Sequence, residues 1–311
     1  MNILCTGGAG YIGSVLVSLL LREGHNVTVL DNFRTGYRTS LLPVISNNNL
    51  SVIEGDARDY KVLNDVLKNQ DFILPLAAVV GAPACAKDPI TAETTNLESL
   101  QRLLKALYNH QQKIIWPCSN SGYGVGEKGI ACTEETPMRP VSLYGELKVK
   151  AENVLLRYEN TISLRLATVF GVSPSVRWDL LVNDFVYRAV HDRYVLLYEP
   201  HFIRNYIHVF DVARAFLHAI EHFDSMKGQA YNVGLSNANL SKLELCEEIK
   251  KQVPNFDFVE SAFGNDPDKR NYIVSNAKIE ALDFHPVVSL QEGITELIKA
   301  SKLVIRERRD Y

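Results

Sequence analysis

The sequence predicts an α/β fold in which helices cover both faces of a parallel sheet. Short apolar runs, suited to strands buried on both faces, alternate with amphipathic helical patterns through the first half of the chain. A glycine-rich segment joins the first strand to the first helix. Because such strands pair in parallel through right-handed crossovers, we expect a doubly wound sheet. After about residue 171 the alternation loosens, which indicates a smaller C-terminal α/β lobe.

The elements of the first half can be placed in order. Apolar or β-branched runs predict strands at residues 3–5, 27–30, 50–53, 72–76, 114–116 and 162–166. Between them, apolar residues recur at the three- and four-residue spacing of helices that bury one face. These helical patterns cover residues 15–20, 97–107 and 149–158.

The second half contains less regular elements. Residues 180–191, 209–222, 242–252 and 290–305 look helical, and residues 193–198, 230–233 and 256–259 look like short strands. We predict a dinucleotide-binding domain over residues 1–171, with a returning segment at about 203–234, and a substrate lobe over residues 172–311. No linker rich in Gly or Ser separates them, so the two parts should pack as one unit.

Composition excludes several classes of protein. The chain has 311 residues, 46% of them hydrophobic, and its 33 basic and 36 acidic residues give a net charge of -3. This hydrophobic content is too high for a disordered chain, and a nucleic-acid binder would show a basic excess. No apolar run approaches the roughly 18 residues that span a bilayer. Met1 leads into a strand without an export signal, so we expect a cytoplasmic protein with no membrane or nucleic-acid partner.

Neither the cysteines nor the histidines predict a metal site. The five cysteines are scattered without CxxC spacing, which suits reduced, buried thiols. His218 and His222 lie four apart on a predicted helix, but Glu221 is misplaced for a zinc-protease motif and no third ligand is evident.

The glycine-rich segment has the pattern of a dinucleotide-binding turn. It contains Gly7, Gly10 and Gly13, or alternatively Gly8 with the last two, and Tyr11 and Ile12 open the helix that follows. Such a turn brings bare backbone close to a pyrophosphate, and the helix N–H groups point at the negative charge.

The end of the second strand indicates which dinucleotide is bound. Asp31 lies about 20 residues further on, where a carboxylate holds the adenosine ribose diol. That carboxylate repels the extra phosphate of NADP, and Asn32 follows it instead of an arginine, so NAD is favoured. Arg34 and Arg38 leave NADP open, because a nearby arginine accepts a 2′-phosphate.

A second motif supplies a proton acceptor. Tyr144 and Lys148 lie one turn apart on a helix that begins after Pro140. A tyrosine with a pKa of about 10 needs a neighbouring ammonium to accept a proton at neutral pH, and Lys148 can also bond the nicotinamide ribose. With the glycine turn and Asp31, this motif resembles the short-chain dehydrogenase/reductase superfamily. The run from residue 139 to 152 is similar to its extended branch, which modifies nucleotide sugars.

The resemblance implies further site residues. Ser119, four residues before the pair Tyr123-Gly124, would bond the reacting hydroxyl and act with Tyr144 and Lys148. The cofactor contacts would include Asn32, Asp56, Ala57, Leu76, Ala77, Ala78, Asn96 and Ala167, which extend the Rossmann-type turn. Thr168 follows Ala167 where the family usually has an asparagine.

The same resemblance implies a substrate site. Arg204, in a run similar to the family's RDYIHV motif, and Arg270 would converge on a diphosphate, because guanidinium groups suit phosphate oxygens. The remaining substrate candidates are Ser121, Tyr123, Arg177 and Asn183.

Residues beside Ser119 bear on the reaction. The 4,6-dehydratases of this family place an acid pair where this chain has Asn120 and Ser121, neither of which does acid/base work near neutral pH. Fucose-synthase-type epimerases use a cysteine at the second position. The chemistry is therefore predicted to stay at C4, as a 4-dehydrogenase or a 4-epimerase.

The resemblance favours the dehydrogenase. Residues 120–128 and 76–83 are similar to GDP-D-glycero-D-manno-heptose 4-dehydrogenases, which implies a GDP-sugar substrate, tightly held NADH and reoxidation by 2-oxoglutarate. A 4-epimerase is the alternative, and a non-catalytic binding protein is a lesser one because such proteins usually lose the Tyr or Lys. Helices over residues 96–110 and 142–158 resemble the family's dimer interface, so we predict a homodimer, although the leucines of the first would equally suit a core.

Overall fold

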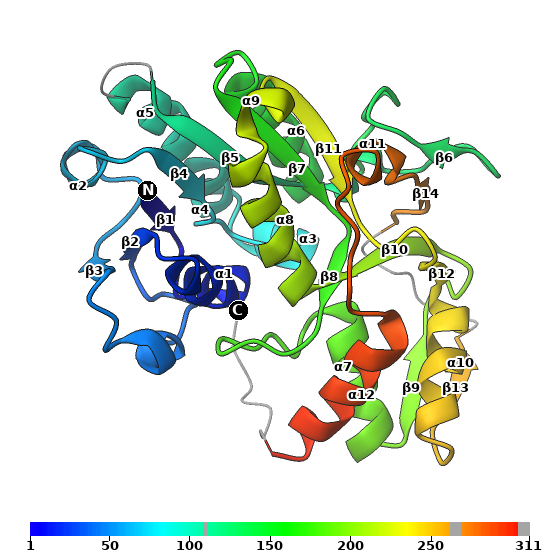
Figure 1. The fold of residues 1–311 in the computed structure, drawn as a ribbon. Coiled ribbons are helices and arrows are strands. Elements are labelled where there is room, and N and C mark those ends of the chain that lie inside the picture. The colour runs from blue at the N-terminus through cyan, green and yellow to red at the C-terminus, as the bar shows by residue number, and fades with distance from the viewer. Residues whose placement is uncertain (108–110, 262–268, 304–311) are drawn as a thin grey trace.

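The computed structural model describes residues 1–107, 111–261 and 269–303 (Figure 1). Its main element is a seven-stranded sheet in the order β11-β7-β5-β4-β1-β2-β3. Every neighbouring pair in it is parallel, which confirms the predicted fold class. The strands are β1 (Asn2–Thr6), β2 (Asn26–Asp31), β3 (Leu50–Glu54), β4 (Phe72–Pro75), β5 (Lys113–Ser119), β7 (Thr161–Leu166) and β11 (Gln229–Val233).

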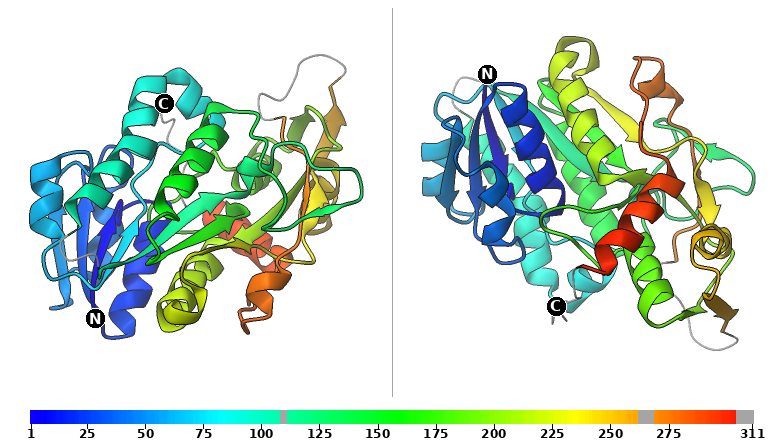
Figure 2. Two further views of the ribbon diagram at one scale, coloured as in Figure 1. Left: turned by 90° about the horizontal axis from the view of Figure 1, so that it is seen from above. Right: turned by 60° about the horizontal axis from the view of Figure 1, so that its bottom comes forward.

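Helices cover both faces of this sheet (Figure 2). On one face α1 (Tyr11–Arg22) packs against α8 (Val209–Glu221), and on the other α5 (Ser99–Ala106) lies between α2 (Tyr60–Val66) and α6 (Leu143–Leu155). Alternate residues of β1 lie in the two cores on opposite faces of the sheet. Ile3 and Cys5 lie in the core with α1 and α8, and Leu4 lies in the core with α2, α5 and α6. A strand buried on both faces therefore reads as a continuous apolar run.

The segment between β4 and β5 holds several short helices. They are α3 (Ala82–Lys87), α4 (Pro89–Glu93) and the π-helical turn η2 (Thr94–Glu98), which runs directly into α5. Leu97, Leu100 and Leu107 are buried in the core, and Leu104 is partly buried against it, as the core alternative for these leucines expects. The homodimer stays a prediction, and residues 108–110 of that predicted interface lie outside the described residues.

The C-terminal lobe has its own sheets and core. A three-stranded sheet contains β8 (Thr168–Phe170), β10 (Ile203–His208) and β12 (Asn239–Ser241), and β9 (Tyr194–Leu197) pairs in parallel with β13 (Asp257–Glu260). Their core is completed by α7 (Leu181–His191), α10 (Lys242–Gln252) and α12 (Leu290–Ser301). The predicted second-half helices are thus present, and residues 304–305 of the last one lie outside the described residues.

The chain passes between the two parts more than once. In the predicted returning segment, α8 and β11 join the large sheet, whereas β10 belongs to the smaller one. In the other direction, β6 (Ala131–Cys132) pairs with β14 (Ile273–Val274). Two short helices, α9 (Phe223–Met226) and α11 (Ala277–Glu280), and two 3-10 turns, η1 (Arg38–Val44) and η3 (Asn120–Tyr123), complete the described elements.

Two further expectations can be compared with the structure. All five cysteines are buried and free, as the sequence predicts. Among the residues that the structure describes, no helix is long and apolar enough to cross a membrane.

We expect the α1–α8 core to be sensitive to cavity formation. Leu16 is fully buried in that core, so Leu16→Ala should lower the free energy of unfolding by about 2–5 kcal/mol in urea denaturation. Leu42, which is 59% exposed, provides the control, because Leu42→Ala should change stability by no more than about 0.5 kcal/mol. Equal losses in the two variants would contradict this packing.

Candidate active site

The glycine turn after β1 is built for close backbone approach. Gly7 has a φ of +72°, and a Cβ placed on it would lie 2.7 Å from the backbone nitrogen of Ala77. A Cβ on Gly13 would overlap the Gly7 carbonyl oxygen. The helix α1 starts after Gly10 without a side-chain cap, so its first N–H groups can bind an outside acceptor. This geometry fits a dinucleotide pyrophosphate.

Asp31, the last residue of β2, anchors the same turn. Its carboxylate accepts hydrogen bonds from the backbone N–H of Ala9 at 2.9 Å and of Phe33 at 2.8 Å. These bonds hold the carboxylate beside the glycine turn, and each oxygen keeps a lone pair for a ribose hydroxyl. Asn32 is exposed, and its amide lies 3.3 Å from the Asp56 carboxylate.

Arg34 and Arg38, the two arginines that could accept the 2′-phosphate of NADP, both face carboxylates. Arg38 forms a two-pronged ion pair with Glu54 at the end of β3. Arg34 lies 3.9 Å from Asp88. Both guanidinium groups are therefore engaged with acids, which supports the preference for NAD over NADP.

Asp56 lies next to the turn, near the predicted adenine edge. The Arg58 side chain binds this carboxylate at 2.7 and 3.0 Å and holds its pKa down at about 2. Ala57 is half-buried against the core beneath it. The structure thus brings both residues to the predicted side of the turn.

The segment after β4 borders the glycine turn. The backbone of Leu76 and Ala77 donates to the carbonyl and hydroxyl oxygens of Thr6 at 2.9 and 3.3 Å. One residue beyond Ala78, the Asn96 amide binds both backbone groups of Val79, each at 2.8 Å. Asn96 belongs to η2, so this π-helical turn steadies the segment that passes the cofactor site.

The three predicted catalytic residues meet at the carboxyl end of β5. Ser119 ends β5, and α6 begins one residue before Tyr144. The Ser142 hydroxyl caps that helix by accepting from the Gly145 N–H at 3.2 Å. Lys148, one turn further on, donates to the Pro117 carbonyl of β5 at 2.7 Å, which ties the helix to the strand.

The charges around Tyr144 differ from the sequence-based expectation. Burial raises the pKa of Tyr144, while the Arg270 guanidinium and a hydrogen bond with Ser119 lower it in part. Lys148 is 4% exposed and its ammonium lies 4.4 Å from the Trp116 ring, and burial lowers its pKa to about 8. Arg270 thus adds a positive charge that the sequence did not predict for the tyrosine hydroxyl, while the Lys148 ammonium lies 5.9 Å from the centre of the Tyr144 ring.

The residues after Ser119 carry no acid. Ser121 donates its hydroxyl proton to the Ser119 oxygen at 2.9 Å, so the Ser119 proton remains available to another acceptor. The Asn120 side chain is buried, and neither end of its amide has a hydrogen-bond partner among the described residues.

The two predicted diphosphate arginines are neighbours. Arg204 is 2% exposed on β10, and its guanidinium donates to the backbone carbonyls of Ile203 and Arg270. Arg270 itself lies 3.3 Å from the Tyr272 hydroxyl. The structure thus brings the Arg204 side chain against the backbone of Arg270, and both guanidinium groups lie near Tyr272, with Arg270 also close enough to Tyr144 to affect its pKa.

Other substrate candidates lie elsewhere. The Asn183 amide binds the backbone of Gly171 and Arg177, and the Tyr11 hydroxyl donates to the Gly171 carbonyl at 2.8 Å, which places this group beside α1. The Arg177 side chain pairs with Asp179. Their predicted contact with substrate stays a prediction.

Tyr123 and Ala167 have structural contacts. The Tyr123 hydroxyl accepts from Arg165 at 3.0 Å and lies 2.7 Å from the Asn232 amide oxygen. Ala167 is buried at the end of β7, where its N–H donates to Val233. Sequence reasoning missed the Arg165–Glu152 ion pair that joins Tyr123, although Glu152 follows Lys148 at the same four-residue spacing that separates Lys148 from Tyr144.

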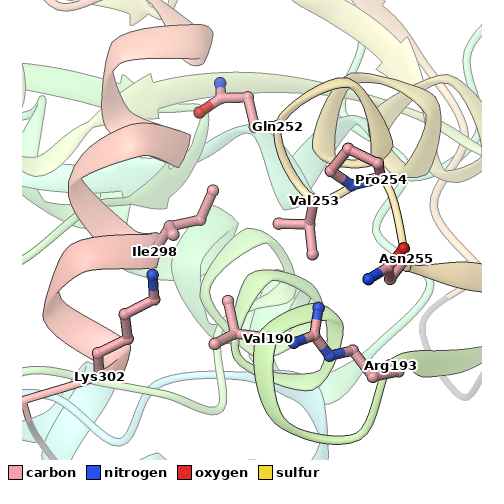
Figure 3. Close-up of a pocket in the computed structure, with 8 residues that line it drawn as sticks. All are labelled: Val190, Arg193, Gln252, Val253, Pro254, Asn255, Ile298 and Lys302. Atoms are coloured by element: carbon pink, nitrogen blue, oxygen red, sulfur yellow. The ribbon is translucent and has the colours of Figure 1, made fainter.

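One pocket lies away from all these residues. It has a volume of about 270 Å³ and sits where α7, α10 and α12 end, lined by Val190, Arg193, Gln252, Val253, Pro254, Asn255, Ile298 and Lys302 (Figure 3). Within the described ranges, no three His, Cys, Asp or Glu side chains gather as metal ligands, and the His218 and His222 rings stack at 4.3 Å.

Comparison with known proteins gives a consistent picture. The model of the NAD dependent epimerase/dehydratase family matches residues 3–234. A UDP-glucose 4-epimerase of Lacticaseibacillus casei is 31% identical over 278 residues, 81% of this chain and 81% of that protein. A dTDP-glucose 4,6-dehydratase of Streptomyces niveus is 28% identical, covering 96% of this chain and 92% of that protein.

A solved structure extends the similarity to the whole fold. The UDP-glucose 4-epimerase of Thermus thermophilus in complex with NAD superposes with a TM-score of 0.82 at 26% identity. The match covers 97% of this chain and 99% of that one.

We expect the glycine turn to control cofactor retention. Gly7→Ala should greatly weaken NAD binding in calorimetric titration, because its Cβ would collide with the backbone at Ala77. Gly129→Ala is a matched control, since Gly129 has a similar φ of +77° with no atom within 4 Å of the added Cβ. That control should cost about 1 kcal/mol of stability and leave NAD affinity unchanged. Equal affinity losses would contradict the assignment.

We also expect the buried ammonium to make stability depend on pH. Because the Lys148 pKa is about 8 in the folded protein and about 10.4 in the unfolded chain, the unfolded state binds more protons between these values. The contribution of Lys148 to stability should therefore rise by about 1–2 kcal/mol from about pH 7 to about pH 9.5. Urea denaturation should show this rise relative to Lys148→Met. Lys150 is exposed, so Lys150→Met should show the same rise of stability with pH as the wild type. Loss of the rise in Lys150→Met would contradict its assignment to Lys148.

Proposed function

The chain belongs to the NAD dependent epimerase/dehydratase family, and we propose that it is a nucleotide-sugar 4-epimerase acting through a 4-keto sugar. The observation that carries this proposal is the meeting of Ser119, Tyr144 and Lys148 at the carboxyl end of β5, without an acid beside them. In a doubly wound sheet, ligands bind at the carboxyl ends of the strands.

Each of the three residues has a role in the proposed reaction. The Tyr144 phenolate oxygen takes the proton of the sugar C4 hydroxyl as the C4–O bond becomes a carbonyl, and returns it in the second half. The Ser119 hydroxyl accepts from Ser121 and is hydrogen-bonded to Tyr144, and with substrate bound its proton would stabilise the sugar C4 oxygen. Arg270 favours the phenolate, and Lys148 donates to a ribose hydroxyl.

Bound NAD would supply the hydride acceptor for oxidation at C4 and the hydride donor for the return reduction on the other face of the keto sugar. Gly7, Gly10, Gly13, Tyr11 and Ile12 would hold its pyrophosphate, and Asp31 its ribose. Arg204 and Arg270 would bind the substrate diphosphate and leave the sugar free to rotate between the two halves.

The absence of an acid beside Ser119 confines the chemistry to C4. Loss of water from the sugar requires one group to remove the C5 proton and another to protonate the leaving C6 hydroxyl. Asn120 and Ser121 stand in those positions, and an amide and a hydroxyl do neither near neutral pH. Dehydration is therefore disfavoured in this chain, whichever sugar it binds.

UDP-sugars are the first substrates to test. The relative from Lacticaseibacillus casei and the superposed structure are both UDP-glucose 4-epimerases. A GDP-heptose 4-dehydrogenase is the second candidate, favoured by the resemblance of residues 120–128 and 76–83 to that group. There the keto sugar would leave, and 2-oxoglutarate would take a hydride from NADH and a proton from solvent to become 2-hydroxyglutarate.

One experiment separates the two candidates. The protein is incubated with UDP-, GDP-, dTDP- and CDP-sugars, with and without 2-oxoglutarate, and the products are identified by NMR and mass spectrometry. C4 epimers that approach equilibrium without 2-oxoglutarate support the epimerase. A 4-keto sugar that accumulates only with 2-oxoglutarate, together with 2-hydroxyglutarate, would replace it by the dehydrogenase. A 4-keto-6-deoxy product would contradict both.

We expect Tyr144→Phe to lower kcat by about 10²- to 10⁴-fold, because the proton acceptor is removed. NAD should remain bound, as measured by release of the cofactor on denaturation. Tyr158→Phe is the control: the Tyr158 hydroxyl donates to the Gln112 carbonyl, and it should retain kcat. An unchanged rate in Tyr144→Phe would refute the assignment.

A further inference from the structure

A buried ion pair lies on the catalytic helix, one turn beyond Lys148. The Arg165 side chain of β7 is 9% exposed and that of Glu152 on α6 is 3% exposed. The guanidinium binds both carboxylate oxygens, at 2.7 Å through one terminal nitrogen and at 3.1 Å through Nε. The Ser163 hydroxyl donates to the same carboxylate at 2.6 Å.

A buried ion pair contributes little net stability to a core. Removing two charges from water costs several kcal/mol each, and well-packed apolar replacements are often neutral or stabilising. Stability alone is therefore a weak explanation of Glu152 and Arg165. Their position relative to the catalytic residues suggests a stronger one.

The pair is linked to both halves of the candidate site. Tyr144, Lys148 and Glu152 follow one another at four-residue spacing, so they share one face of α6. From the other side, Arg165 donates to the Tyr123 hydroxyl at 3.0 Å, and Tyr123 ends the turn η3 that follows Ser119. The ion pair thus joins the helix of the proton acceptor to the segment of the serine.

We propose that Glu152 is a positioning residue for the proposed reaction. Its ion pair with Arg165, which in turn donates to the Tyr123 hydroxyl, holds the turn η3 against α6, and its carboxylate lies one helical turn from the Lys148 ammonium. This inference rests on the proposed function for its effect on rate, whereas the effect on the charge of Lys148 is independent of any substrate.

The surroundings of Lys148 support the electrostatic part. The groups that act on it are Cys118 on β5, Cys85 on α3 and Glu152 on α6, whose carboxylate is paired with Arg165 on β7, and the Tyr144 ring centre lies 5.9 Å from the ammonium. Burial raises the pKa of both thiols, to about 11 for Cys85, so both are uncharged near neutral pH. Glu152 is then the carboxylate that favours the ammonium form of Lys148, and it acts as one member of a pair whose positive member is Arg165.

The test compares three variants by two measurements. Glu152→Gln removes the charge but keeps the shape. The double variant Glu152→Gln with Arg165→Met leaves no unpaired charge buried, so it keeps the test valid if the single variant fails to fold. Glu146→Gln makes the same change at an exposed position of the same helix and is the control.

The first measurement is the titration of Lys148, followed by NMR in protein labelled with ¹³C at the lysine Cε and assigned with Lys148→Arg. We expect the midpoint to fall by about half a unit or more in Glu152→Gln and in the double variant, and to stay unchanged in Glu146→Gln. The pH above which NAD affinity decreases should also be lower in the two Glu152 variants than in the wild type. A wild-type midpoint in the double variant would overturn the proposal.

The second measurement separates positioning from folding. On the sugar found to be turned over, kcat should fall at least about tenfold in both Glu152 variants, with KM within about twofold of wild type. Wild-type kcat in the double variant would mean that the pair is merely structural. If the wild-type protein turns over none of the sugars, the proposed function fails, while the titration and NAD affinity still decide the role of Glu152.

Discussion

The candidate site depends on one energetic constraint, the burial of the Lys148 ammonium between α6 and β5. An amine removed from water tends to lose its proton, and burial lowers the pKa of Lys148 to about 8. The Pro117 carbonyl and the Trp116 ring partly replace the lost water. Because both belong to β5, the interaction that satisfies the charge also fixes the catalytic helix beside Ser119.

The cofactor side depends on a steric constraint. The turn after β1 and the segment after β4 approach so closely that a side chain at Gly7 would meet the backbone of Ala77. Asp31 and Asn96 then hold these two backbones with hydrogen bonds from opposite sides. Backbone groups positioned in this way can face a pyrophosphate without a cluster of basic side chains, which is compatible with a net charge of -3.

The family to which the chain belongs contains both epimerases and dehydratases, and the departures from the dehydratase pattern are local. They fall at Asn120 and Ser121, directly after the serine, while the fold and the Tyr–Lys pair are retained. The buried amide of Asn120 and the hydroxyl of Ser121 do no acid/base work near neutral pH. On the proposed function, these two side chains on one turn distinguish this chain from a dehydratase, while the fold that would carry NAD is shared.

The parallel α/β fold, the glycine turn and the Tyr144–Lys148 pair can be predicted without a structure, because local periodicity or a fixed residue spacing indicates each of them. The charges that act on these residues follow from how separate elements pack. Arg270, distant in sequence, lies close enough to lower the pKa of Tyr144, and Arg165 on β7 meets Glu152 on α6. The structure also shows that the leucines of α5 face the core and that the Tyr123 hydroxyl is bound to Arg165. Hydrogen bonds and electrostatic fields depend on distances in space, and these distances are set by the packing of elements that lie far apart in the sequence.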